Sequence, residues 1–153
     1  MHLCAYAERP DIGAVVHAHP PTVTAFTIAG LTLDAPVLPE VVLALGAVPT
    51  AAYATPSTDE GATRIRDLVR AHDVIVLDRH GAVAVGRDPL EGFRRLEKLE
   101  QAAEILWKAH QLGGVRTLPA EEVARLLAMR CGFKSAHSGP TQPVKRFTDS
   151  YLH

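Results

Sequence analysis

The chain has 153 residues, of which 47% are hydrophobic and 22% charged, a balance that is typical of one globular domain. Lys+Arg 16 against Asp+Glu 17 give a formal net charge of -1, which excludes the basic surface of a nucleic-acid-binding protein. No apolar run reaches the ~20 residues that cross a bilayer, and the N-terminus lacks the pattern of a signal peptide. Two cysteines are too few for a disulfide framework, which indicates a cytoplasmic location.

The first part of the chain is predicted to contain two helices around one strand. Residues Met1–Glu8 have the pattern of the end of a helix, and the β-branched run Ala14–His19 predicts a strand. Two prolines stop this strand, and a short helix is expected over Pro21–Ala29. The run Val37–Leu45 is apolar but short, so that its pattern leaves helix and strand open.

The middle of the chain is predicted to form a helix and a hairpin. Apolar residues recur at helical spacing from Thr58 to Ala71. The runs Asp73–Leu77 and Ala82–Val85 have the pattern of two strands joined by a tight turn.

The last part is predicted to be helical until its apolar pattern ends. Asp88 is the expected N-cap of the longest helix, which stops at two glycines, and Ala120–Met129 is the expected last helix. Residues 132–153 show no periodicity and are expected to form an irregular tail. The order of elements predicts a single domain over residues 1–153, of the α/β class, with helices packed on a mixed, mainly antiparallel sheet.

The strongest local signal for chemistry is the pair His17 and His19. Residues two apart in a strand point to the same face, so both imidazoles project side by side, as two ligands of a transition metal must. Pro20 ends the strand and places both rings at the edge of the sheet. A chance His-x-His, or a hydrogen-bonded pair in a half-buried site, has the same sequence and stays open as an alternative.

His80 adds a third candidate ligand. It lies in the turn Asp78–Gly81, directly after a buried strand, where a side chain is held rigidly and still reaches the surface. Gly81 suits a backbone that needs positive φ or a close approach. Three histidines leave one coordination position open for water or substrate. The other five histidines are expected to be structural or solvated: His2, His72, His110, His137 and His153.

Several stretches of the sequence together resemble the class II aldolase/adducin family. They are Ala5–Pro20, Pro49–Thr55, Val76–Gly81, and the long-helix segments Arg95–Glu100 and Ala102–Leu106. The resemblance covers about residues 1 to 128. It implies a three-layer α/β/α fold and a homotetramer with active sites at subunit interfaces. It also implies that His17, His19 and His80 bind a divalent metal, usually Zn²⁺.

The reaction that the resemblance implies is the cleavage of a small phosphorylated sugar. A bound dication polarises the carbonyl of a ketose 1-phosphate of the L-fuculose-phosphate type and stabilises the enediolate that retro-aldol cleavage leaves. The products are dihydroxyacetone phosphate and an aldehyde. A carboxylate must move the protons in such a reaction.

The sequence departs from the family in two places. The acid/base glutamate of the aldolases and their phosphate-binding residues lie upstream of the position of Met1, so we expect this chain to be N-terminally incomplete. Leu38 stands near the place of a catalytic tyrosine that the aldolases contribute across the subunit boundary. Glu40 is then the candidate catalytic acid/base, because a carboxylate in an apolar run is partly desolvated. A solvent-facing glutamate at a helix start, after Pro39, is the alternative.

Two other functions remain open on the same scaffold. A sugar-phosphate dehydratase or epimerase is favoured by Glu40, since a glutamate at a similar distance after His-x-His serves as acid/base in relatives that dehydrate a sugar phosphate. A non-catalytic, adducin-like interaction module is favoured by the missing acid and phosphate-binding residues, but it has no need of three convergent imidazoles.

Overall fold

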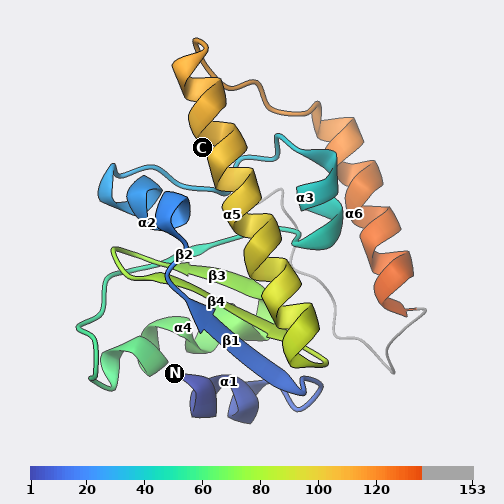
Figure 1. The fold of residues 1–153 in the computed structure, drawn as a ribbon. Helices are drawn as coiled ribbons and strands as arrows, with labels where there is room; N and C mark the ends of the chain where they lie inside the picture. Colours follow the sequence, from blue (N-terminus) through green and yellow to red (C-terminus); the bar gives the residue numbers. More distant parts are fainter. Residues whose placement is uncertain (136–153) are drawn as a thin grey trace.

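The computed structural model describes residues 1–135. Its elements in chain order are α1 (His2–Glu8), β1 (Ala14–Ala18), α2 (Pro21–Ile28), α3 (Pro39–Ala44), β2 (Thr50–Ala51), α4 (Glu60–Ala71), β3 (Val74–Leu77), β4 (Gly81–Gly86), α5 (Pro89–Gln111) and α6 (Ala120–Ser135). Figure 1 shows the strands lying side by side, with helices on both sides of them. Within residues 1–135, no helix combines the length and the apolar character that crossing a membrane requires.

The four strands form one sheet in the order β1-β4-β3-β2. β4 pairs antiparallel with β1 and with β3, whereas β2 runs parallel to β3. The predicted hairpin is the β3–β4 pair, in which Val74 lies opposite Ala84 and Leu77 opposite Gly81. The expectation of a mixed, mainly antiparallel sheet is therefore confirmed.

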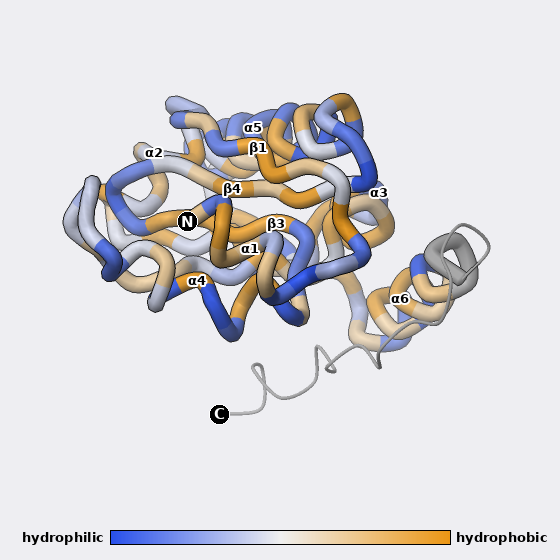
Figure 2. Tube along the Cα trace, turned by 90° about the horizontal axis from the view of Figure 1, so that it is seen from below, coloured by the Kyte–Doolittle hydropathy of each residue, from blue (hydrophilic) through white to orange (hydrophobic). Residues whose placement is uncertain are grey.

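The strands separate two apolar cores, because successive side chains point to opposite faces of a sheet. Val74 and Val76 pack into the core shared with α2 and α5, whereas Ile75 and Leu77 pack into the core shared with α1 and α4. Figure 2 shows the apolar strands between α5 on one side and α1 and α4 on the other. This is the three-layer α/β/α arrangement, and it explains why all of β3 is apolar.

The structure settles one ambiguous segment as a helix and extends the last predicted helix. The ambiguous run Val37–Leu45 contains the helix α3, which begins at Pro39 because proline fits the first helical position. The last helix passes the predicted end at Met129 and runs to Ser135, since a single glycine at 132 weakens a helix by only about 1 kcal/mol. The expectation of an irregular tail is thus wrong for residues 132–135, and residues 136–153 lie outside the described part.

The strand β2 is an element that the sequence did not predict. It has two residues, Thr50 and Ala51, which are too few to show an alternating pattern. Its pairing with Val76 and Leu77 attaches the loop after β2 to the central hairpin.

The helix α5 begins as predicted and supports the sheet. The carboxylate of Asp88 accepts a hydrogen bond from the N–H of Glu91 at 2.8 Å, and Pro89 occupies the first turn. Leu96 and Leu99 are buried on the face that packs against β1 and β4. The helix therefore supports β1, which carries His17, and β4, which begins directly after His80.

A buried carboxylate joins three distant elements at one end of β3. Asp73 is 4% exposed. Its carboxylate forms ion pairs with Arg9 at 3.2 Å, Arg95 at 3.6 Å and Arg130 at 2.9 Å. Arg130 also donates to the carbonyls of Leu43 and Ala44, which anchors α6 on the end of α3. Burial lowers the pKa of Arg130, and the charge of Asp73 opposes this shift.

The substitution Asp73→Asn is expected to lower the free energy of unfolding by about 3–5 kcal/mol, because three partly buried guanidinium groups lose their counter-charge. Denaturant-induced unfolding measures this change. Asp67→Asn is the matched control: its carboxylate is 89% exposed and pairs with Arg70 at 3.1 Å, so the change is expected to stay below about 1 kcal/mol. Equal changes in the two variants would contradict the role of the buried network.

Candidate metal centre

The end of β1 carries the first two histidines of the site. His17 is half-buried in β1 opposite Val83, and His19 is exposed directly after the strand. Their rings lie on the same side of the strand, with centroids 4.8 Å apart, as the spacing predicts. Pro20 is buried and is the N-cap of α2, so the chain turns away from the sheet immediately after His19.

The turn between β3 and β4 carries the third histidine. The N–H of His80 donates to the carbonyl of Leu77 at 3.1 Å, which closes the turn. The N–H of Asp78 donates to the carbonyl of Ala51 at 3.1 Å, so β2 holds the start of the turn. Arg79 has φ 56°, a left-handed conformation that is uncommon for a residue with a side chain.

Gly81 allows the turn and the end of β1 to approach each other. Its φ is 155°, and a Cβ atom here would lie 2.3 Å from the carbonyl oxygen of Ala18 and 2.9 Å from Cδ2 of His19. Both expectations for this residue, positive φ and close approach, are therefore confirmed. Only a glycine permits this packing, because the nearest obstacle is backbone and cannot rotate away.

The structure brings His17, His19 and His80 together. The ring centroid of His80 lies 4.9 Å from that of His17 and 5.0 Å from that of His19. One ring nitrogen of each histidine lies within 4.8 Å of the other two. Within residues 1–135, these three side chains form the group that could hold a metal ion.

The donor atoms fit a tetrahedral divalent ion. Zinc binds imidazole nitrogen at about 2.0–2.1 Å, so tetrahedral angles put two ligand nitrogens about 3.4 Å apart. The Nε2 atoms of His17 and His19 are 3.2 Å apart in the structure. Three imidazoles leave a fourth position for water or substrate, which is the arrangement of catalytic rather than structural zinc sites.

The tautomer of His17 is controlled by the backbone of β4. Its Nδ1 lies 2.9 Å from the carbonyl oxygen of Ala82, so Nδ1 carries the proton and Nε2 offers a lone pair to the site. Burial lowers the pKa of this imidazole, the charges of His80 and His19 lower it further, and the hydrogen bond to Ala82 opposes the shift. The neutral ring is the form that binds a metal.

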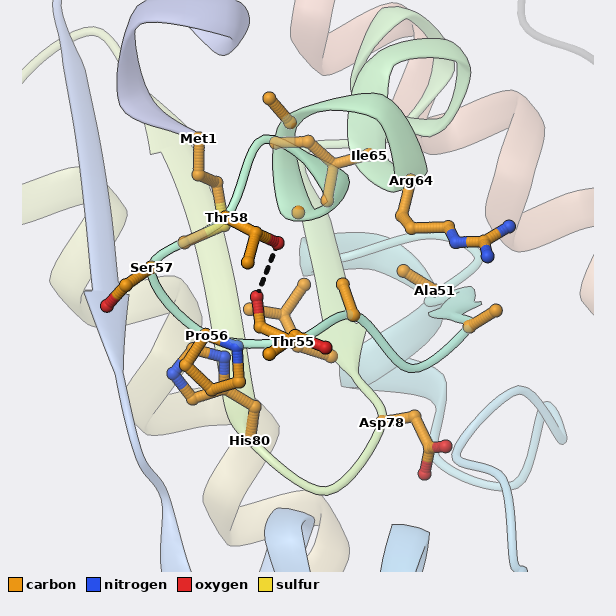
Figure 3. Close-up of a pocket in the computed structure, with 15 residues that line it drawn as sticks. Met1, Ala51, Thr55, Pro56, Ser57, Thr58, Arg64, Ile65, Asp78 and His80 are labelled. Atoms are coloured by element: carbon orange, nitrogen blue, oxygen red, sulfur yellow. Dashed lines mark hydrogen bonds between the residues drawn. The ribbon is translucent and has the colours of Figure 1, made fainter.

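A cavity of about 190 Å³ opens beside His80 on the α4 side of the sheet. Figure 3 shows His80 and the loop Thr55–Thr58 at this cavity, with Ile65 of α4 on its far wall. The hydroxyl of Thr58 donates to the carbonyl of Thr55 at 2.7 Å, which ties the loop to itself. A small polar molecule that enters this cavity therefore meets hydroxyl groups on one wall and an imidazole on another.

The structure does not bring Glu40 to the three histidines. Glu40 lies in the first turn of α3, a helix that packs against α5 and α6, and its side chain is exposed. The partial desolvation that its apolar neighbours suggested is absent within this chain. The reason is that Pro39 starts a helix here, and a carboxylate in the first turn is stabilised by the positive end of the helix dipole while it stays in contact with water.

Sequence reasoning missed two side chains that bond to the backbone next to the histidines. Thr27 of α2 is buried and accepts a hydrogen bond from the turn of His80, and Glu100 of α5 accepts hydrogen bonds from the first turn of α2. Neither lies in a motif, and a threonine or a glutamate in a helix is by itself unremarkable. They are recognised only from their hydrogen bonds in the folded structure.

The substitution Gly81→Ala is expected to destabilise the fold by about 2–3 kcal/mol, because a methyl group meets the backbone of Ala18 and the residue must keep a positive φ. Thermal or denaturant unfolding measures the change. Gly61→Ala is the control: it lies in α4 with open space around the added methyl, so a gain of about 0.5–1 kcal/mol is expected. An unchanged free energy of unfolding in Gly81→Ala would show that the end of β1 and the turn can move apart without cost.

Comparison with known proteins agrees with this geometry. Residues 1–107 match the family described as "Class II Aldolase and Adducin N-terminal domain". This matched region includes the end of β1 and the turn that carries His80, and so it includes all three histidines.

The curated relatives include enzymes of two reaction types. The 5-methylthioribulose-1-phosphate/5-deoxyribulose-1-phosphate aldolase of Rhodospirillum rubrum is 32% identical over 123 residues, which cover 79% of this chain and 55% of the relative. The 3-oxo-tetronate 4-phosphate decarboxylase of Escherichia coli K12 is 32% identical over 131 residues, which cover 82% of this chain and 60% of the relative. Decarboxylation was not among the reactions that the sequence suggested.

A solved structure of an L-fuculose 1-phosphate aldolase has a TM-score of 0.74 with this chain at 29% identity, and the match covers 83% of this chain and 59% of that one. The chain spans 55% to 60% of the length of the two curated relatives above. The family match over residues 1–107, together with the fold and the three-histidine cluster that it contains, shows that this chain belongs to the class II aldolase/adducin family.

Proposed function

We propose that this protein is a metal-dependent lyase that cleaves a ketose 1-phosphate of the L-fuculose-phosphate type into dihydroxyacetone phosphate and an aldehyde. The observation that carries the proposal is the convergence of His17, His19 and His80, with ligand atoms within 4.8 Å of one another. The sugar-phosphate aldolases among the relatives support the choice of substrate class.

The three histidines are proposed to hold one Zn²⁺ ion. A bound divalent ion polarises a substrate carbonyl and stabilises the negative charge that develops when the neighbouring carbon–carbon bond breaks. Imidazoles are neutral ligands, so this set leaves the full charge of the ion available. His17 contributes a fixed geometry, because the carbonyl of Ala82 holds its ring.

Decarboxylation of a phosphorylated 3-oxo acid is the second candidate function. The decarboxylases among the relatives support it. Loss of carbon dioxide and retro-aldol cleavage both leave an electron pair on a carbon next to a carbonyl, so the same positive centre serves both. The two reactions differ in the leaving fragment, which is carbon dioxide in one case and an aldehyde in the other.

Glu40 is proposed to act as the acid/base in the site of a neighbouring subunit. Its exposed position on α3, away from the histidines of its own chain, supports a role across an interface. The proposed assembly is a homotetramer with interfacial active sites. A dehydratase or epimerase would use the same glutamate, whereas a purely adducin-like module would need neither Glu40 nor the three imidazoles.

Purified protein is expected to bind one Zn²⁺ per chain and to release an aldehyde from at least one member of a panel of ketose 1-phosphates. His80→Asn is expected to weaken zinc binding by about 100-fold or more and to abolish turnover, because one of three protein ligands is lost. Arg94→Gln, a control on an exposed part of α5, is expected to change neither property. Zinc content is measured by mass spectrometry and products by aldehyde, carbon dioxide and dehydration assays.

Two results would overturn the proposal. If the folded protein binds no divalent metal, the three histidines are not a metal site and the proposal fails. A zinc-loaded protein that releases carbon dioxide but no aldehyde replaces the aldolase by the second candidate.

Glu40→Gln is expected to lower kcat by about 100-fold or more while zinc content stays at the wild-type value, because a proton-transfer group is lost and no ligand is removed. Glu97→Gln, on an exposed face of α5, is the control with unchanged kcat. Subunits carrying Glu40→Gln and His80→Asn, refolded together, are expected to recover about a quarter of the wild-type activity if each site takes residues from two chains. Mixed subunits without recovered activity would contradict the interfacial role.

A further inference from the structure

The helix α2 connects the two chain segments that carry the histidines. It begins at Pro21, two residues after His19, and its other end lies against the turn that carries His80. The pairing of β1 with β4 ends at the pair Ala18 and Ala82, so His19 and His80 both lie beyond the last rung of this ladder. Their separation therefore depends on contacts outside the sheet.

One contact holds the beginning of α2. The carboxylate of Glu100 accepts hydrogen bonds from the N–H of Thr22 at 2.9 Å and from the N–H of Val23 at 3.0 Å. The N-cap residue Pro20 has no side-chain acceptor, so the free N–H groups of the first turn take their partner from α5. A carboxylate at this end of a helix is also favoured by the helix dipole.

A second contact holds the end of α2. Thr27 is buried, and its hydroxyl donates to the carbonyl of Thr24 at 2.8 Å. The same oxygen accepts a hydrogen bond from the backbone N–H of Arg79 at 2.9 Å. Arg79 directly precedes His80 and has the left-handed φ of 56°, so the hydroxyl fixes a backbone that has few alternatives.

We propose that Thr27 and Glu100 are positioning residues of the three-histidine site, and that α2, clamped between them, sets the distance from the His17 and His19 pair to His80. This inference rests on the proposed function, because it assumes that the three imidazoles share a metal ion. The two residues touch no donor atom of the site. They act by holding the backbone that orients the ligands, as the second shell of a metal site does.

Metal affinity and a spectroscopic signature test the proposal at the Thr27 end. Thr27→Val keeps the shape of the side chain and removes both hydrogen bonds, and it is expected to weaken Zn²⁺ binding by about 10–100-fold. It is also expected to change the visible absorption of the Co²⁺-substituted protein, which reports coordination geometry. Thr27→Ser keeps the hydroxyl and is expected to restore both readouts. Thr63→Val, an exposed threonine on α4, is the matched control with wild-type values.

The Glu100 end is tested by a substitution that removes only charge. Glu100→Gln replaces a charged acceptor by a weaker neutral one, and a loss of about 3–10-fold in Zn²⁺ affinity is expected. Glu104→Gln is the matched control on the same helix, because its exposed carboxylate pairs with Lys108 at 2.8 Å. Circular dichroism of each variant confirms that the helices are retained.

The outcomes separate this inference from the proposed function. A wild-type protein that binds neither Zn²⁺ nor Co²⁺ overturns both. A wild-type protein that binds the ions, with a folded Thr27→Val variant of the same affinity and spectrum, overturns the positioning role and leaves the metal site standing. If Thr27→Val does not fold, a Glu100→Gln variant indistinguishable from Glu104→Gln overturns it in the same way.

Discussion

The close approach of two backbone segments at Gly81 is the constraint on which the candidate metal centre depends. The carbonyl oxygen of Ala18 occupies the space that any side chain at this position would need. Because the contact is between backbone and backbone, no rotamer change can relieve it. The end of β1 therefore packs directly against the turn, and the centroids of the three imidazole rings lie 4.8–5.0 Å apart.

The strand β3 separates two features of opposite character. Asp73 precedes it and is buried among three arginines, while His80 follows it and borders a cavity that opens to solvent. The four residues of the strand itself, Val74–Leu77, are apolar and buried. One end of this strand thus ties helices to the sheet, and the other presents imidazoles. Such a division suits a site that needs rigid support and an accessible ligand position.

Local patterns account for what could be predicted from the sequence. The hairpin, the cap at Asp88 and the shared face of His17 and His19 each follow from residues that are close in the chain. The strand β2 is too short to have a pattern, and the apolar neighbours of Glu40 suggested a desolvation that a helix start does not provide. Thr27 and Glu100 were not predictable, because their partners lie 52 and 77 to 78 residues away in the chain.

The pairing of β1 with β4 has a consequence for the order in which the molecule assembles. The β3–β4 hairpin joins neighbours in the chain and can form early, whereas the contact of His17 with Ala82 closes a separation of 65 residues. The hairpin that carries His80 therefore closes a much shorter loop than the pairing that brings His17 and His19 to it. An ion that requires all three rings would bind only chains in which the β1–β4 pairing has formed, and it would thereby stabilise the native state.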